Sequence, residues 1–119
     1  MEWKFTGAEP VYLQIMEHFR GAVLSGEFGP GEKVPSVRDL AAQARVNPNT
    51  MQRAMAELEQ EGLLCSRGTL GRFVTEDPAV VERLRHRHIR ATVAHCRQLL
   101  AQVGLTLDQA ARLTEDEEE

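Results

Sequence analysis

The sequence predicts a mainly α-helical protein with one small β-hairpin, followed by a C-terminal region of two helices. Three observations support this fold class. Apolar residues recur every three or four positions through most of the chain. Pro, Gly and capping residues stand at the ends of these periodic segments. Two short apolar stretches near residue 70 are joined by a glycine-containing turn. The chain has 119 residues, of which 42% are hydrophobic and 27% charged, as is usual for a folded globular protein.

Two helices are predicted in the first third of the chain, over residues 10–25 and 36–44. Pro10 suits the first turn of a helix because its missing amide needs no partner there. Ser36 can cap the second helix, and Asp39 three residues later completes a capping-box-like pair. The first helix has an apolar face made by Tyr12, Ile15, Met16, Phe19, Ala22 and Val23.

A third helix is predicted from residue 47 to about residue 61, directly after a tight turn. Asn47 is a good N-cap and Pro48 occupies the first helical position, which together form a strong start signal. Gly62 is the expected left-handed stop. One face is apolar, with Met51, Ala54, Met55 and Leu58, and the other is mostly polar, with Asn49, Thr50, Gln52 and Arg53.

A β-hairpin and two further helices complete the predicted elements. The stretches 63–66 and 72–75 flank Gly68-Thr69-Leu70-Gly71, as two strands around a turn. A long helix then runs from Pro78 to about residue 103, and a last helix begins where Thr106 and Gln109 can form a cap. The long helix carries a stripe with alternating spacings of four and three residues, typical of a helix–helix seam, at Ile89, Val93, Cys96, Leu100 and Val103.

Helix, short helix, tight turn, helix and hairpin is the element order of a winged helix-turn-helix domain. Several strings within residues 10–75 occur in a characteristic order: Pro10-Val11-Tyr12-x-Gln14-Ile15, then Pro30-Gly31-Glu32-Lys33-x-Pro35-Ser36-Val37-Arg38-Asp39-Leu40-Ala41, then Val46-Asn47-Pro48-Asn49-Thr50-Met51-Gln52-Arg53-Ala54, then Leu58-Glu59-x-Glu61-Gly62-Leu63 and Phe73-Val74. In these strings the chain resembles the GntR family of bacterial transcription regulators, and in particular its YtrA-like subfamily. The resemblance implies sequence-specific DNA binding, with a recognition helix at about 47–61 in the major groove and a wing at 66–72 at the minor groove.

The residue types at the start of the third helix fit this role. A recognition helix places its first turn in the major groove, with side chains that donate to base edges or phosphates. Arg38 matches the arginine of the family's P-S-x-R motif, which contacts DNA in relatives. The candidate DNA-binding residues are Ser36, Arg38, Asn47, Asn49, Thr50, Gln52 and Arg53, with Arg67, Gly68, Gly71 and Arg72 in the wing.

Some of these assignments have alternatives. Asn47 caps its helix whether or not it contacts a base, and Arg53 can instead pair with Glu57 one turn later. The family wing usually reads R-G-x-G, whereas this chain has Gly68-Thr69-Leu70-Gly71, with its arginine one residue earlier, at Arg67. Contacts from the wing are therefore less secure than contacts from the third helix.

The second half is too short for the effector domain of larger GntR relatives, and dimerisation is its predicted use. The alternative is that its apolar stripe folds back on the winged-helix domain of the same chain. His88 and His95 are too far apart on a straight helix to share one ion, so we expect a solvated basic face, with no metal and no other cofactor. The candidate dimerisation residues are Leu84, Ile89, Val93, Cys96, Leu100, Val103 and Leu107.

The formal net charge of the whole chain is −4, which by itself argues against a nucleic-acid partner. The charges of the separate segments remove this objection. Residues 33–72 carry six basic and four acidic side chains, residues 73–114 carry the same numbers, and residues 115–119 are all acidic. A terminal run of like charges is typical of a solvated, disordered end. We therefore expect a DNA-binding domain over 1–76, a dimerisation region over 77–114 and a disordered acidic tail over 115–119.

The sequence thus predicts a transcription regulator whose partner is double-stranded DNA at a pseudo-palindromic operator. The resemblance implies a dimeric repressor of its own operon. The alternative is a winged-helix protein-interaction module, although such modules usually replace residues such as Asn49, Gln52 and Arg53 with acidic or apolar ones.

No nucleophile–base pair, metal triad or phosphate loop is visible, so we expect no catalytic residue and no enzyme. No signal-peptide pattern and no apolar run of about 20 residues occurs, which predicts a cytoplasmic location without a membrane partner. An effector cannot be read from the chain.

Overall fold

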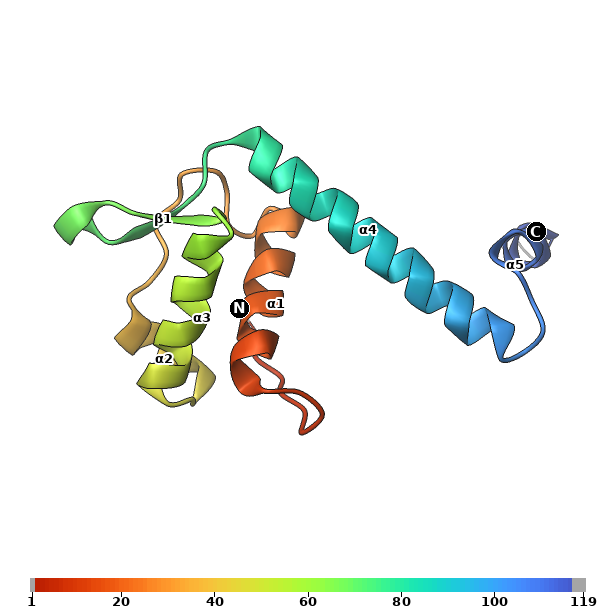
Figure 1. Cartoon of the computed structure of the whole chain (residues 1–119), viewed down its shortest axis with the longest axis horizontal. Helices are drawn as coiled ribbons and strands as arrows, with labels where there is room; N and C mark the ends of the chain where they lie inside the picture. The colour runs from red at the N-terminus through yellow and green to blue at the C-terminus, as the bar shows by residue number, and fades with distance from the viewer. Residues whose placement is uncertain (1, 117–119) are drawn as a thin grey trace. The chain divides into compact units, whose positions relative to one another are not determined.

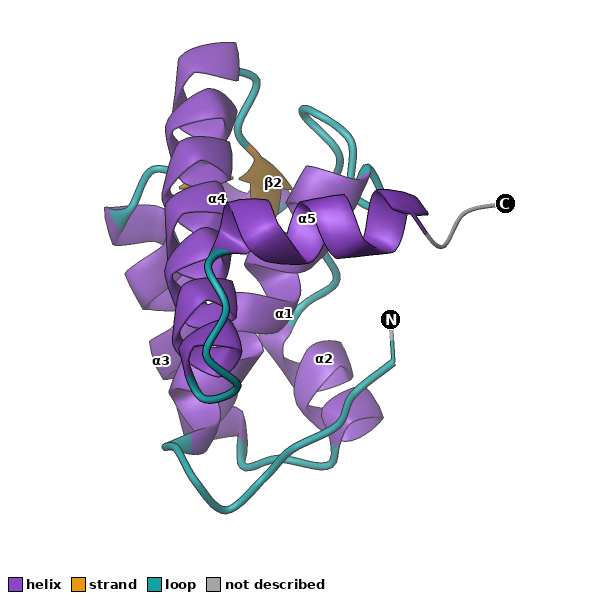
Figure 2. Cartoon of the chain, turned by 90° about the vertical axis from the view of Figure 1, so that its right-hand side faces the viewer, coloured by secondary structure: helices purple, strands orange, loops and turns teal. Residues whose placement is uncertain are grey.

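The computed structural model describes residues 2–116; residues 1 and 117–119 lie outside the described part. In chain order the elements are α1 (Val11–Ser25), α2 (Val37–Ala44), α3 (Pro48–Gln60), β1 (Leu64–Ser66), the short 3-10 helix η1 (Gly68–Leu70), β2 (Arg72–Val74), α4 (Pro78–Ala101) and α5 (Leu107–Asp116) (Figures 1 and 2). The predicted fold class and element order are confirmed. Most element ends differ from the predicted ones by one or two residues.

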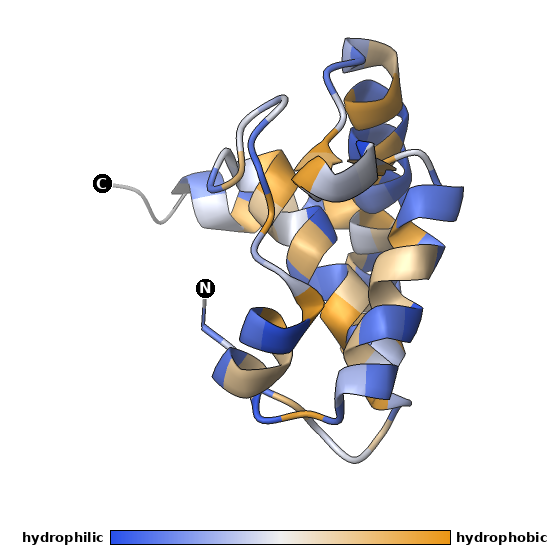
Figure 3. Cartoon of the chain, turned by 90° about the vertical axis from the view of Figure 1, so that its left-hand side faces the viewer, coloured by the Kyte–Doolittle hydropathy of each residue, from blue (hydrophilic) through white to orange (hydrophobic). Residues whose placement is uncertain are grey.

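The first compact unit, Met1–Leu84, is built around the apolar faces of the first three helices. α3 packs against α1, α2 and β1, so it lies at the centre of the unit. The predicted apolar face of α3 is confirmed, since Met51, Ala54, Met55 and Leu58 are all buried. Figure 3 shows the resulting division of the helices into hydrophobic and hydrophilic faces. Burial of each large side chain contributes about 1.5–3 kcal/mol, so α3 is firmly held.

Local capping explains where the helices begin and end. The Ser36 hydroxyl accepts a hydrogen bond from the Asp39 amide at 3.1 Å, which confirms the predicted cap of α2. Gly62 follows α3 in the left-handed region, with φ of 81°, as a helix stop requires. At α5 the cap is reciprocal: the Thr106 amide donates to Gln109 Oε1 at 2.9 Å, and the Gln109 amide donates to Thr106 Oγ1 at 3.2 Å.

The hairpin has a third backbone partner that the sequence pattern did not predict. β1 and β2 pair antiparallel, with Ser66 opposite Arg72. The preceding loop adds to β2, because the Val34 amide donates to the Arg72 carbonyl at 2.9 Å and the Val74 amide donates to the Glu32 carbonyl at 2.9 Å. The base of the wing is therefore fixed to the segment that leads into α2.

The boundary between the two compact units differs from the predicted one. The first unit ends at Leu84, inside α4, and not at residue 76. The reason is that Val80 and Val81 pack against the core, and Leu84 is itself a core residue, only 5% exposed. The side chain of Leu84, which the sequence assigned to the dimer interface, is therefore already buried within its own unit and leaves little surface for a partner.

The second unit, Arg85–Glu119, contains the rest of α4 and α5. Its apolar stripe is largely uncovered: Ile89 is 49% exposed and Val103 70% exposed, whereas Val93, Cys96, Leu100 and Leu107 are half-buried. α5 continues to Asp116, so residues 115–116 are helical and do not belong to a disordered tail. The rest of that predicted tail, 117–119, lies outside the described residues. No helix in the described part is long and apolar enough to cross a membrane.

Candidate nucleic-acid interface

α2 and α3 form a helix-turn-helix whose second helix presents its polar side to solvent. Asn49 and Gln52 are exposed, and Thr50 beside them is half-buried. The opposite side of α3 is anchored in the core, so these three polar side chains project from a rigid helix. α3 thus carries four of the eleven residues that the sequence predicted for DNA contact: these three and Arg53.

Asn47 is the N-cap of α3. Its Oδ1 accepts a hydrogen bond from the Asn49 amide at 2.7 Å, and its side chain is exposed. The predicted capping role is confirmed. Because the cap uses only the oxygen of the amide, the nitrogen is free to donate to a neighbouring group.

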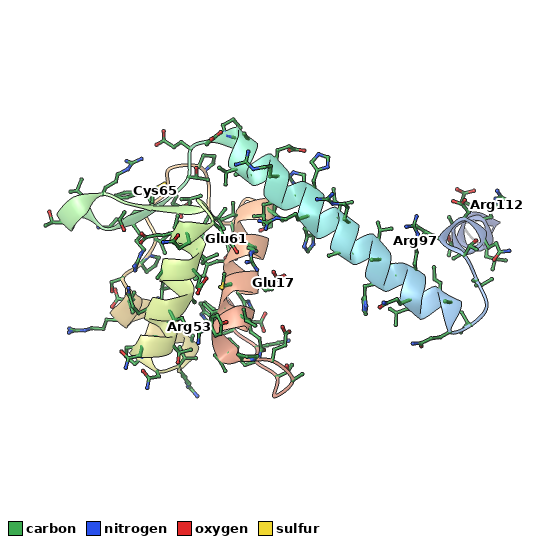
Figure 4. The ribbon with its side chains drawn as sticks, viewed as in Figure 1. Glu17, Arg53, Glu61, Cys65, Arg97 and Arg112 are labelled. Carbon is green, nitrogen blue, oxygen red and sulfur yellow. The ribbon has the colours of Figure 1, made fainter. Side chains whose placement is uncertain are left out.

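Arg53 has a partner that sequence reasoning missed. Its guanidinium carbon lies 3.7 Å from the centre of the Tyr12 ring on α1, a cation–π contact. Figure 4 shows Arg53 on the side of α3 that faces α1. In the described part of the chain no ion pair joins Arg53 to Glu57, so this predicted alternative is absent. Because Tyr12 fits the apolar pattern of its helix, the sequence predicted it only as a core residue and not as a partner for Arg53.

The start of α2 supplies a further cation. Arg38 lies in the first turn of α2 and is exposed, and no ion pair involving it occurs among residues 2–116. Ser36, two residues earlier, caps the helix through its hydroxyl oxygen. An exposed arginine next to a helix N-terminus suits a phosphate, because both attract negative charge.

In the wing, Arg67 is held against its own hairpin. Its Nη2 donates to Glu76 Oε1 at 3.2 Å, and its guanidinium lies 4.6 Å from the centre of the Phe73 ring. The side chain is still 48% exposed. At the tip of the wing, Gly68 is open to solvent and a side chain there would meet nothing.

Gly71 closes the turn in a backbone conformation that other residues rarely adopt, with φ of 112°. A Cβ atom at this position would lie 3.2 Å from Cε of Lys33. The backbone conformation therefore favours glycine here, whereas the end of the lysine side chain could move aside by a few tenths of an ångström. This constraint explains its presence without any contact to DNA.

Arg72 turns toward α3 and not toward solvent. Its Nε donates to Glu59 Oε1, and its Nη1 donates to Gln52 Oε1 at 3.5 Å. Ser66, opposite Arg72 on β1, donates to the same Glu59 oxygen at 2.7 Å. The hydrogen bond from Arg72, and after it the one from Ser66, lowers the pKa of the Glu59 carboxyl. Sequence reasoning missed Glu59, although it stands seven residues after Gln52 and so on the same face of the helix.

The other end of α3 is braced against α1. Arg20 Nε donates to Glu61 Oε2 at 3.2 Å, its Nη2 donates to Glu61 Oε1, and its Nη1 donates to Glu17 at 2.7 Å; Figure 4 labels both carboxylates. Burial, the largest single influence, lowers the pKa of Arg20, but the hydrogen bonds and negative charges of Glu61 and Glu17 together outweigh it, so the pKa is raised overall. This half-buried bidentate pair fixes the direction in which α3 points.

A groove of about 590 Å³ lies between the start of α2 and the wing. It brings together residues from two motifs that are far apart in the sequence, including Ser36 of the P-S-x-R string and Arg72 of the wing. Lys33 and Asp39 also line it, so the groove carries both signs of charge. No group of three or more His, Cys, Asp or Glu side chains suited to a metal occurs within residues 2–116.

The arrangement of α1 to β2, with its exposed polar helix and its hairpin, is that of a winged helix-turn-helix protein. Residues 11–74 match the sequence description of bacterial regulatory proteins of the gntR family. The chain belongs to the GntR family.

Relatives and solved structures agree with this assignment. The chain is 34% identical over 109 residues to the uncharacterised HTH-type transcriptional regulator YhcF of Bacillus subtilis, covering 92% of this chain and 90% of that protein. It is 40% identical over 68 residues to the HTH-type transcriptional repressor YtrA of the same species, covering 57% of this chain and 52% of YtrA. The resemblance to YtrA is thereby confirmed.

Among solved structures, a GntR family transcriptional regulator from Listeria monocytogenes superimposes with a TM-score of 0.85 at 28% identity, covering 94% of this chain and 98% of that one. The DNA-binding domain of AraR in complex with its operator ORX1 superimposes with a TM-score of 0.58 at 30% identity, covering 63% of this chain and 96% of that one. The second match covers a smaller share of this chain than the first.

Proposed function

We propose that this chain is a cytoplasmic, sequence-specific DNA-binding regulator that acts as a homodimer and represses its own operon. The observation that carries the proposal is the pair of exposed amide side chains, Asn49 and Gln52, with the half-buried Thr50 hydroxyl beside them, at the start of a helix whose other face is buried. The AraR domain, whose solved structure includes operator DNA, has the same fold in this region. A related protein is named as a repressor.

In the proposed complex, α3 enters the major groove with its first two turns. Asn49 and Gln52 donate to base edges, and Thr50 supplies a hydroxyl beside them. The N-terminus of α3, with Asn47, faces a phosphate, and so does Arg38 at the start of α2. The tip of the wing lies at the minor groove.

The second unit supplies the proposed dimer contact. An apolar stripe that is half exposed at Ile89 and mostly exposed at Val103 is costly to leave in water, and a second copy of the chain would cover it. Two paired recognition helices then read two half-sites whose centres lie about 34 Å apart, or a multiple of that distance. The operator is accordingly expected to be pseudo-palindromic.

A protein-interaction module is the competing function. It would place a partner protein on the face that we assign to DNA. The exposed amides of Asn49 and Gln52 favour DNA, because a protein-docking helix is better served by apolar side chains. We do not propose an enzymatic activity, because the relatives of this chain are named as transcriptional regulators.

The proposal is tested by selecting bound duplexes from a random pool with the full-length protein. A single enriched motif made of two inverted half-sites is expected. Binding to that motif should weaken steeply as salt rises, because several phosphate contacts release counterions. Failure to enrich any motif at low salt would reject specific DNA binding and leave the protein-interaction module as the better account.

A further inference from the structure

α3 carries one basic side chain, Arg53, one turn after Asn49 and on the side of the helix that faces α1 (Figure 4). Arg53 is exposed, and its guanidinium carbon lies 3.7 Å from the centre of the Tyr12 ring. Within residues 2–116 this guanidinium forms no ion pair and donates no hydrogen bond to another group of the protein. The proposed recognition helix therefore has an uncompensated positive charge close to its base-reading residues.

The contact with Tyr12 holds the guanidinium without using its hydrogen-bonding groups. An aromatic face attracts a cation through its electrons and supplies no oxygen or nitrogen acceptor. The five N–H donors of the guanidinium are therefore still available to a ligand. Tyr12 is itself held in place, because it is half-buried in the first turn of α1 and packs against the core. The ring thus gives a flexible side chain one fixed support.

The position of Arg53 on its helix decides what those donors meet. A major groove about 12 Å wide is nearly filled by a helix of about 10–12 Å diameter, so the flanks of the helix lie against the phosphates that border the groove. Asn49 and Gln52 project from the proposed base-facing side, whereas Arg53 lies on the flank next to α1. A guanidinium there can give two parallel hydrogen bonds to the oxygens of one phosphate.

Resting on the DNA-binding function proposed above, we infer that Tyr12 is a positioning residue that holds Arg53 for a two-pronged hydrogen bond to one phosphate beside the major groove. The binding group is Arg53, and the tyrosine acts through it by means of its ring. Ordering a long side chain when DNA binds costs affinity. The contact with Tyr12 orders Arg53 in the free protein, so less freedom is lost when each half-site binds.

The first test asks whether the ring of Tyr12 is the group that matters. Tyr12→Leu and Tyr12→Phe are titrated by fluorescence anisotropy against the duplex selected by the wild type, and urea unfolding shows that each variant folds. Tyr12→Leu removes the ring and should weaken binding about threefold per half-site, or about tenfold for a dimer. Tyr12→Phe keeps the ring and should bind like the wild type. Equal losses in the two variants would overturn the inference, because the ring would then not be the cause.

The second test asks whether Arg53 meets a phosphate. Loss of one phosphate contact lowers the slope of log affinity against log salt by about 0.9 for each half-site. Arg53→Met should show this smaller slope, and Arg53→Lys, which keeps the charge but not the fork, should bind more weakly with the wild-type slope. Arg97→Met is the matched control, because it removes the same charge from an exposed position of the second unit, and its slope should equal that of the wild type. An unchanged slope in Arg53→Met, or an equal change in Arg97→Met, would contradict the phosphate contact.

A double-variant cycle shows whether the two residues act together. Tyr12→Leu is made in the wild type and in Arg53→Met, and the two losses of affinity are compared. In Arg53→Met the tyrosine has nothing left to position, so no further loss is expected there. A loss of the same size in both backgrounds would mean that Tyr12 acts by another route, which rejects the inference and leaves the regulator intact. A wild type that enriches no motif would reject the proposed function itself.

Discussion

Substitutions of Asn47 separate its role as a cap from the position of its helix at DNA. Its Oδ1 accepts from the Asn49 amide at 2.7 Å. Asn47→Ala removes this acceptor and should lower the free energy of unfolding by about 1 kcal/mol. Asn47→Asp keeps an acceptor and adds a negative charge at the positive end of α3, so its stability should equal or exceed the wild type by about 0.3–1 kcal/mol.

The order of the variants should reverse when DNA binding is measured. A carboxylate about 6 Å from a phosphate, at an effective dielectric constant of about 40, is repelled by about 1.4 kcal/mol. Each such phosphate weakens binding about tenfold per half-site, so Asn47→Asp should bind far more weakly than Asn47→Ala. Urea unfolding followed by circular dichroism gives the stabilities, and fluorescence anisotropy with the selected duplex gives the affinities. An Asp variant that is stable and binds as tightly as the wild type would refute the placement of this helix end at DNA.

Further predictions concern the contacts, the dimer, the wing and the core. Arg38→Ala should weaken binding to selected and random duplexes alike, whereas Gln52→Ala should also erase the preference between them; equal losses for Gln52→Ala in both titrations would argue against base reading. Val93→Asp should convert a dimer to monomers in sedimentation, and a persistent dimer would move the interface elsewhere. The lowered pKa of Glu59 means that its link to Arg72 stabilises the fold above pH 4.5 and is lost as pH falls through the folded-state pKa. Denaturation midpoints between pH 3 and 6 should therefore fall less for Glu59→Gln than for the wild type, and parallel curves would contradict this. Leu58→Ala should cost about 2–5 kcal/mol of unfolding free energy, and a loss below 1 kcal/mol in urea would contradict the central position of α3.

Much of the fold could be predicted because the first and last residues of its helices are set by local hydrogen bonding and backbone conformation. Pro48 after Asn47 starts α3 whatever surrounds it, and Gly62 ends it in a conformation that suits glycine. Ser36 and Thr106 cap their helices through neighbours three residues away. Such signals lie within a few residues of the sequence, so they can be read without the tertiary structure.

The contacts that position the candidate site could not be predicted in the same way. Arg53 had a plausible partner one turn away in Glu57, but its guanidinium lies over Tyr12, 41 positions earlier in the chain. Arg72 is a wing residue by sequence, yet it pairs with Glu59 on α3. Long charged side chains can reach several neighbours, and the packing of α1, α3 and the hairpin determines which of these neighbours lie close enough to contact.

Leu84 illustrates the same limit for the core. Its spacing is compatible with the apolar stripe of the long helix, so the sequence assigned it to the dimer seam. The first turns of α4 are instead part of the first unit, and the side chain is buried there. Helical periodicity predicts that a helix face is buried, but it does not tell whether the same chain or a partner chain covers that face.

The central claim, that the polar start of α3 lies against DNA bases, is tested most directly by crosslinking. A photoreactive benzophenone side chain at position 49 is compared with the same group at position 17, an exposed position on α1, using full-length protein and the selected duplex. We expect an efficient crosslink from position 49, mapped to a base within each half-site, and none above background from position 17. Equal labelling from the two positions, or crosslinks from position 49 only to protein, would contradict it.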